Sequence, residues 1–296
     1  MAIERSVLLR RGMLARVIVH EWSGSISDRA LAAKVAAESG GRPTHHKHAK
    51  ILPTPAELRP WKQAKAELAT LMEVLLQEPP KEFAPWKFLS TRAFDIWKES
   101  VERVVISLDQ AKKEFERAYP AILADGPNRI GTSFNTKDYP LCSEIGKHFG
   151  VEIHYKPIPR AEEVSWEHLS PEEQSRIKTK VEEELSSLGR ALGEDMKRRT
   201  KKAVTHLVER VGALVAKHRT GAPCRFYDTV IEGVREIVAT IPNMNIGDDV
   251  ELDTVVKRIE AELLGFSSTE LKASPEAAEE ALRKAEDIQK QMSDWS

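Results

Sequence analysis

The chain is poor in cysteine, in aromatic residues and in uninterrupted hydrophobic runs. Only two of its 296 residues are cysteines, Cys142 and Cys224, and they stand far apart in no spacing that is typical of a zinc or redox site. We therefore expect reduced thiols and a cytoplasmic protein. Near the N-terminus the apolar run 7–9 is followed by arginines, so we predict neither a secretory signal nor a membrane span.

The sequence also lacks the motifs of the common enzyme classes. It has no phosphate-binding loop, dinucleotide glycine fingerprint, nucleophile elbow, zinc-protease pair or kinase signature. The acidic stretch 248–253 has neither the glycine nor the spacing of a calcium loop. These absences do not exclude an enzyme, but they favour a binding or structural role. We accordingly predict no catalytic residue and no cofactor.

Charge and helical periodicity are what the sequence has in abundance. Charged residues make up 31% of the chain, more than the usual quarter, as long exposed helices require. Ser170, Pro171 and Glu173 form a predicted capping box, and Gly221 is a predicted left-handed C-terminal cap. Between them apolar residues recur in steps of three and four, at Ile177, Val181, Leu185, Leu188, Leu192, Met196, Val204, Leu207, Val211 and Leu214. This spacing predicts one helix from about 170 to 219, with a bend near Gly189 or Gly193.

A second apolar seam has the heptad spacing of a coiled coil. Its members are Phe94, Trp97, Val101, Val104, Leu108, Ala111, Phe115, Ala118 and Ile122. We predict that this helix ends or kinks at Pro120 and pairs with the long helix as a hairpin. The alternative is that both are core helices of a larger bundle.

The remaining pattern predicts a mainly α (α+β) fold. Residues 14–22 and 151–156 alternate as strands do. The predicted architecture is a long coiled-coil-like helical hairpin with a small β-containing lobe and a C-terminal helical segment. The predicted domains are a basic α/β segment (1–90), the hairpin (91–219) with an inserted lobe (125–169), and an acidic helical segment (220–296).

A formal net charge of −1 hides an uneven distribution of charge. Residues 1–65 hold twelve Lys and Arg against five acids, whereas residues 248–296 hold six against thirteen. A basic start and an acidic end indicate either a polyanion site or two ends that attract each other, within one subunit or between subunits.

The most concentrated charge is the basic run 197–202. Stacked like charges at positions four apart destabilise a helix, unless an anion such as a polyphosphate backbone neutralises them. We predict nucleic-acid-binding residues here and in the loop 42–50: Lys197, Arg198, Lys201 and Lys202, helped by Arg42, Lys47 and Lys50. The alternatives are a solvated face, or pairing with the acidic residues 182–184 of another subunit. No aromatic residue interrupts the run, so base stacking is not indicated.

His45, His46 and His48 form the most metal-like cluster. Imidazole is a common ligand of zinc and copper, but no carboxylate or thiolate is near in sequence, and Lys47 and Lys50 oppose a cation. We interpret the cluster as part of an exposed basic loop, with a metal site as the alternative.

An ordered set of short motifs resembles a group of uncharacterised bacteriophage and prophage proteins. The motifs are Trp22-Ser23-Gly24, Lys50-Ile51-Leu52, Pro85-Trp86 with Phe88-Leu89, Phe115 with Tyr119-Pro120, Phe134 with Asp138-Tyr139-Pro140, and Phe149 with Pro157-Ile158-Pro159. The resemblance covers about residues 20–210. It implies a phage origin and expression in the bacterial host cytoplasm, and it implies no activity.

The leading hypothesis is therefore a non-enzymatic phage protein that binds nucleic acid or a nucleoprotein partner through basic surface. The first alternative is a phage assembly or scaffold protein, a homo-oligomer held by the heptad helices and by complementary charged ends. The second is a metal-dependent enzyme at the histidine cluster. A phage or host protein partner is also considered, whereas a membrane partner is not expected.

Overall fold

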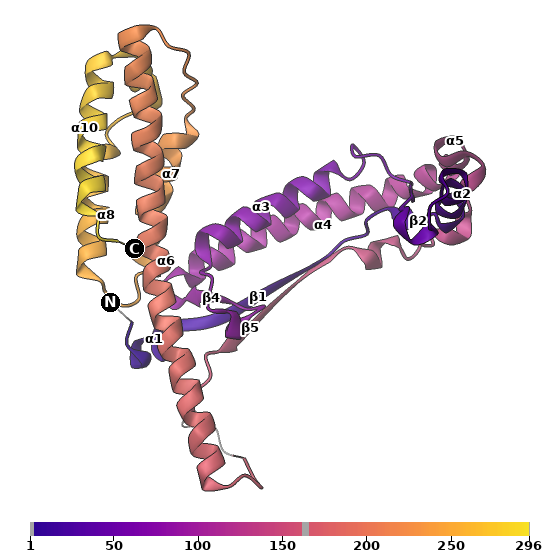
Figure 1. The fold of residues 1–296 in the computed structure, drawn as a ribbon, viewed down its shortest axis with the longest axis horizontal. Helices are drawn as coiled ribbons and strands as arrows, with labels where there is room; N and C mark the ends of the chain where they lie inside the picture. The colour runs from indigo at the N-terminus through magenta and orange to yellow at the C-terminus, as the bar shows by residue number, and fades with distance from the viewer. Residues whose placement is uncertain (1–2, 162–165, 296) are drawn as a thin grey trace. The chain divides into compact units, whose positions relative to one another are not determined.

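The computed structural model describes residues 3–161 and 166–295. It is 67% helical, and the described residues form ten helices and a small antiparallel sheet of three strands (Figure 1). The predicted mainly α fold with a small β lobe is confirmed. No helix in this described part is both long and apolar enough to cross a membrane.

The chain folds into two compact units, each built from separate stretches of sequence. Unit 1 contains the residues up to Arg16, Glu73–Trp97 and the residues from Tyr155 onward, whereas unit 2 contains Val17–Met72 and Lys98–His154. This division differs from the three consecutive segments predicted above. The reason is that strands and helices which are continuous in sequence pass from one unit into the other.

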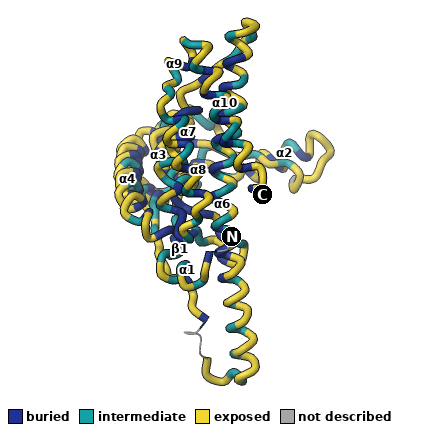
Figure 2. Tube along the Cα trace, turned by 90° about the vertical axis from the view of Figure 1, so that its left-hand side faces the viewer, coloured by how far each residue is buried: buried dark blue, intermediate teal, exposed yellow. Residues whose placement is uncertain are grey.

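Unit 1 is built around α6 (Pro171–Thr220), the long helix predicted from the sequence. Ser170 and Glu173 form the expected capping box, and Gly221 closes the helix in the left-handed conformation, with φ of 72°. Its apolar stripe is buried from Leu185 to Leu214, whereas the first turns of α6 are mostly exposed (Figure 2).

The helices that cover this stripe come from the C-terminal part of the chain. α6 packs against α7 (Thr229–Met244) and α10 (Pro275–Gln291), and α8 (Val250–Leu263) packs against both of these. The short helices α1 (Arg5–Arg11) and α9 (Ser268–Ala273) complete the helical part of unit 1. The structure thus corrects the partner predicted for α6, since α7 and α10 cover its stripe and most of the helix at 94–122 belongs to unit 2.

α6 continues through Gly189 and Gly193 as one helix. A Cβ atom on Gly189 would lie 2.5 Å from the carbonyl oxygen of Ile3, and the Ile3 amide donates to the Gly189 carbonyl at 3.4 Å. Glycine at 189 thus allows the N-terminal segment to approach the helix backbone closely.

The three-stranded sheet has the order β4 (Lys87–Ser90), β1 (Gly12–His20), β5 (Gly150–Pro157). β1 pairs antiparallel with β4, and the register places Gly12 opposite Ser90 and Ala15 opposite Lys87. The strands predicted at 14–22 and 151–156 correspond to β1 and β5. Because β5 is the last strand of the order, it has a strand neighbour on one side only within the described residues.

Unit 2 contains most of α3 (Arg59–Leu75) and of α4 (Phe94–Ala124). It also contains α2 (Arg29–Ser39), a two-stranded antiparallel sheet of β2 (Ser25–Ser27) and β3 (Ala49–Ile51), and α5 (Gly126–Ile130). Short 3₁₀ turns occur at Pro43–His45, Lys81–Phe83, Thr91–Ala93, Gly131–Ser133, Thr136–Asp138 and Ile145–His148.

The heptad seam of α4 forms the core of unit 2. Its members from Val101 to Phe115 are buried, but Ala118 is exposed and the neighbouring Tyr119 is buried in its place. Phe115 contacts Trp22 and Phe149, with ring centroids 6.1 and 5.3 Å apart. The seam therefore packs on aromatic side chains of the same unit, and α4 continues through Pro120 to Ala124. This arrangement corresponds to the alternative of a core helix.

An ion-pair network around Arg129 joins the loops of unit 2. Its guanidinium donates to both carboxylate oxygens of Glu57 at 2.9 and 3.0 Å, to Asp125 at 2.8 Å and to the Leu52 carbonyl at 3.2 Å. Burial acts to raise the pKa of Glu57, but the hydrogen bonds from Arg129 and from the Thr54 amide outweigh it, so that this pKa lies below its ordinary value.

This network predicts a pH-dependent contribution to stability. Arg129→Met should destabilise the protein by about 1–2 kcal/mol at neutral pH, because Glu57 then loses its charged partner. Because the pKa of Glu57 is lower in the folded than in the unfolded state, its ionised form stabilises the fold at pH values above the unfolded-state pKa. The difference in free energy of unfolding between wild type and variant should therefore shrink as the pH falls below about 4. Urea titrations at several pH values measure this. A difference that stays constant from neutral pH to about pH 3 would contradict it.

Candidate functional site

Lys197, the first residue of the basic run, is paired within the chain. Its Nζ lies 2.7 Å from Glu251 and 3.6 Å from Asp249, and it stands over the Trp295 ring, 5.2 Å from the centroid. Burial acts to lower the pKa of Lys197, but the two carboxylates raise it above the ordinary value. Lys197 is thus already paired with two carboxylates, and both belong to the acidic end of the same chain.

Arg198 and Arg199 share the buried carboxylate of Asp195. Arg199 Nε donates to Asp195 Oδ2 at 2.7 Å, and Arg198 pairs with the other oxygen while its own side chain stays 70% exposed. Arg199 also donates to the carbonyls of Glu73 and Leu76, at 2.5 and 2.9 Å. These carbonyls lie at the C-terminal end of α3, where backbone acceptors lack helical partners. Arg199 is therefore a structural residue of unit 1.

The two remaining lysines of the run differ from each other. Lys201 donates to the Trp295 carbonyl at 2.5 Å and to the Ser293 carbonyl at 3.4 Å, so it holds the C-terminal segment against α6. Lys202 is exposed and forms no ion pair with a described residue. Most of the run is thus neutralised inside the chain, and Arg198 and Lys202 are its exposed members.

The basic start and the acidic end meet at Asp248 in unit 1. Asp248 pairs with Arg11 of the basic start at 2.5 Å, and with Arg92, which lies outside that start, at 2.8 Å. These contacts hold the pKa of the Asp248 carboxyl below its usual range. The sequence left open whether the charged ends attract each other within one subunit or between subunits, and the pair of Arg11 with Asp248 lies within one subunit.

A second group of basic residues lies on a small part of unit 2 that we call the basic lobe, residues 25–51. It consists of β2, α2, a 3₁₀ turn and β3, and its five Lys and Arg face only two acids, Asp28 and Glu38. Asp28 is buried and caps α2 by accepting from the Leu31 amide at 3.0 Å, and Glu38 pairs with Lys34.

The predicted residues of the loop are divided between paired and exposed positions. Lys50 is held by Asp138 at 3.0 Å, and that hydrogen bond raises the pKa of Lys50. Arg42 and Lys47 are exposed and have no ion-pair partner in the described part of the chain, and the same holds for Arg29, which was not among the predicted residues. The lobe therefore presents three exposed cations without a neutralising carboxylate.

The histidines of the lobe are not gathered around a common point. His46 Nε2 lies 3.3 Å from Ser39 Oγ, and His45 is exposed. Among the described residues, no group of three or more His, Cys, Asp or Glu side chains is arranged to hold a metal ion. The metal site at His45, His46 and His48 thus gains no support from the geometry.

A different histidine cluster, which was not among the residues predicted from the sequence, lies on β1 and β5. Glu152 is hydrogen-bonded to His20 Nε2 at 3.0 Å through one oxygen and to His154 Nε2 at 3.1 Å through the other. Both hydrogen bonds lower the pKa of Glu152, and the bond from His154 has the larger effect. The spacing of two between Glu152 and His154 places both on one face of β5 and could have been noticed, but the neighbouring His20 is 132 residues away in sequence.

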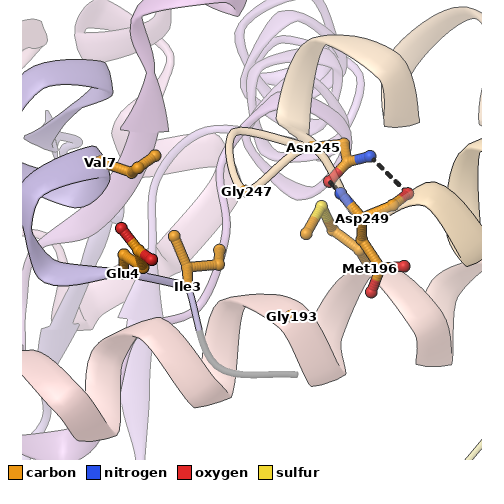
Figure 3. A pocket seen from close by; sticks show the side chains of 8 residues that line it. All are labelled: Ile3, Glu4, Val7, Gly193, Met196, Asn245, Gly247 and Asp249. Carbon is orange, nitrogen blue, oxygen red and sulfur yellow. Dashed lines mark hydrogen bonds between the residues drawn. The ribbon is translucent and has the colours of Figure 1, made fainter.

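Unit 1 also contains a hollow of about 380 Å³ between the N-terminal segment, α6 and the turn before α8. Ile3, Val7 and Met196 are its apolar lining, Gly193 and Gly247 leave space, and Glu4, Asn245 and Asp249 are its polar residues (Figure 3).

Two of these polar residues, Asn245 and Asp249, hold the turn itself. Asn245 Nδ2 donates to the Asp249 carbonyl at 3.1 Å, Asn245 Oδ1 accepts from the Asp249 amide at 3.0 Å, and Asp249 Oδ1 caps α8 through the Leu252 amide at 3.1 Å.

Comparisons of this chain with models of protein families, with curated proteins and with solved structures give no match.

Proposed function

We propose that this protein is a non-enzymatic binding protein whose ligand is a nucleic acid, held through the basic lobe. One observation supports the proposal more than any other: Arg29, Arg42 and Lys47 are exposed on one small lobe, and neither acid of the lobe pairs with them, since Asp28 caps α2 and Glu38 pairs with Lys34. Exposed cations without carboxylate partners are the groups that phosphates can contact with release of counterions.

The basic run on α6 has a smaller part in this proposal than the sequence indicated. Lys197 and Lys201 would have to give up Glu251 and the C-terminal carbonyls before they could contact a phosphate. Arg198 and Lys202 remain exposed and are retained as candidates.

No Phe, Trp or Tyr lies within the lobe, so the proposed contacts are to the phosphate backbone and not to stacked bases. We extend the proposal to the phage setting that the sequence resemblance implies, in which phage or host nucleic acid is the natural ligand.

The test is fluorescence anisotropy of labelled single-stranded and double-stranded DNA and RNA, titrated with protein over a salt series. Arg42→Glu combined with Lys47→Glu should weaken binding at least about tenfold at low salt, and should reduce the slope of log K against log salt by about two. Lys202→Glu should have a smaller effect that is equal for all sequences, as expected for one phosphate contact.

The matched control is Lys98→Glu combined with Lys257→Glu, which reverses the charge of two exposed lysines on α4 and α8. This control should bind nearly as wild type does. Absence of binding at low salt, or equal losses in both double variants, would contradict the proposal. In the first case the assembly role would become the better one.

A further inference from the structure

The residue types of the edge strand β5 are nearly symmetric about its centre. From Gly150 to Lys156 the residues are Gly-Val-Glu-Ile-His-Tyr-Lys, with Ile153 in the middle. An acid and a histidine flank the centre, and a β-branched residue and an aromatic residue stand one step further out, on the opposite face of the strand.

The side of β5 away from β1 is available for pairing. β5 ends the strand order, and among residues 3–161 and 166–295 no other strand pairs with it there. Residues 152 and 154–157 are exposed. The Tyr155 ring packs against Phe94 and its hydroxyl accepts from Trp97 Nε1 at 2.9 Å, but 43% of the residue stays exposed. An exposed edge of this kind is a template for a further strand.

We propose that a second copy of this chain adds its own β5 to this edge, antiparallel, about a two-fold axis at Ile153. In this register Glu152 lies opposite the partner's His154, and His154 lies opposite the partner's Glu152. Val151 lies opposite the partner's Tyr155, a β-branched and aromatic pair of the type that stabilises antiparallel strands. Each contact occurs twice, as an isologous interface requires.

The chemistry of the strand selects this register over its neighbours. Residues directly opposite each other in an antiparallel pair lie on the same face of the sheet. A two-fold axis between the two β5 strands must therefore place one residue opposite its own copy in the partner, and not opposite the next residue along the strand. A centre at Glu152 would place two carboxylates opposite each other, which is unfavourable.

A centre at His154 would place Pro157 opposite Val151, and proline has no amide to donate to the ladder. That register would also use Lys156, whose Nζ already stands over the Trp86 ring of its own chain, 4.2 Å from the centroid.

Glu152 has acceptor capacity left for this contact. Its carboxylate accepts one bond from His20 and one from His154 of the same chain, out of about four lone-pair sites. In the dimer His154 exchanges its bond within the chain for the equivalent bond to the partner, while His20 keeps Glu152 in place.

The first experiment is analytical ultracentrifugation of the full chain from about 1 µM to about 1 mM, a range that covers weak dimers. The wild type should change from the monomer mass of 33.3 kDa toward twice that mass. Glu152→Lys and His154→Glu should each weaken dimerisation at least about tenfold, because each places like or unpaired charges opposite one another.

An equimolar mixture of these two variants should restore dimerisation. In the mixed pair the lysine introduced at position 152 of one copy lies opposite the glutamate introduced at position 154 of the other. The second contact joins the unchanged His154 and Glu152, so both contacts are complementary. The register centred at His154 predicts no rescue, since the introduced lysine would then lie opposite Lys156.

A wild type that stays monomeric, single variants that dimerise as well as the wild type, or a mixture without rescue would each overturn the proposal. Should either charge variant fail to fold, Ile153→Cys in a Cys142→Ser, Cys224→Ser background provides a second test. The thiol introduced at position 153 lies opposite its own copy and should form a disulfide-linked dimer on oxidation, whereas Lys98→Cys in the same background should not. The absence of this cross-link would likewise overturn the proposal.

Discussion

Asp195→Ala is expected to lower the free energy of unfolding by about 3–5 kcal/mol, because it leaves the largely buried guanidinium group of Arg199 without its carboxylate. Asp195 is 4% exposed and pairs with both Arg198 and Arg199, and the Gln77 amide lies 3.5 Å from it. Loss of the carboxylate should also release Arg199 from its position at the end of α3, where it donates to backbone carbonyls. Urea denaturation followed by circular dichroism gives the value.

Two further variants show whether the cost comes from Arg199. Arg198→Ala should cost less than about 1 kcal/mol, since its side chain is mostly exposed and exposed ion pairs contribute little. Asp195→Ala in an Arg199→Met background should cost less than it does alone, because the unpaired charge is then absent. Equal costs for Asp195→Ala and Arg198→Ala would show that the buried pair is not the stabilising element.

Trp61→Ala should lower the free energy of unfolding by about 3–5 kcal/mol, as is usual for deletion of a buried aromatic side chain. Trp61 is 2% exposed on α3 and packs edge-on against Phe149, with ring centroids 4.9 Å apart. Both residues belong to unit 2, so hydrogen exchange should show the loss of protection first in residues 17–72 and 98–154.

Trp61→Phe is the matched control for this prediction. The indole Nε1 of Trp61 is buried and has no hydrogen-bond partner among the described residues. Phenylalanine keeps the aromatic contact and removes this unpaired donor, so its cost should be well below that of alanine. Similar losses for phenylalanine and alanine would mean that the indole nitrogen has a partner in solution, such as a water molecule.

The pairing of charges within the chain moves the proposed ligand contact away from the basic run. A run such as Lys197 to Lys202 is typical of a nucleic-acid contact when only the sequence is considered. In the fold, Lys197 pairs with a carboxylate 54 residues further along, and Lys201 holds the last turn of the chain. The basic lobe keeps three exposed cations without carboxylate partners, and the proposed contact lies there for that reason.

The local features of the fold followed from the sequence alone. The capping box at Ser170, the Gly221 cap, the apolar stripe of α6 and the strands β1 and β5 were all predictable, because each depends on residues within a few positions of one another. The seam of α4 was also predictable as a buried face, although its heptad spacing suggested a pairing with α6 that the packing of α6 on α7 and α10 corrects.

The tertiary structure alone decided which faces and charges meet. The stripe of α6 is equally suited to any apolar partner, and only the fold shows that α7 and α10 cover it. The pairs Lys197–Glu251, Arg11–Asp248 and His20–Glu152 join residues 54, 237 and 132 positions apart. No periodicity links such residues, because their contacts depend on how the complete chain packs.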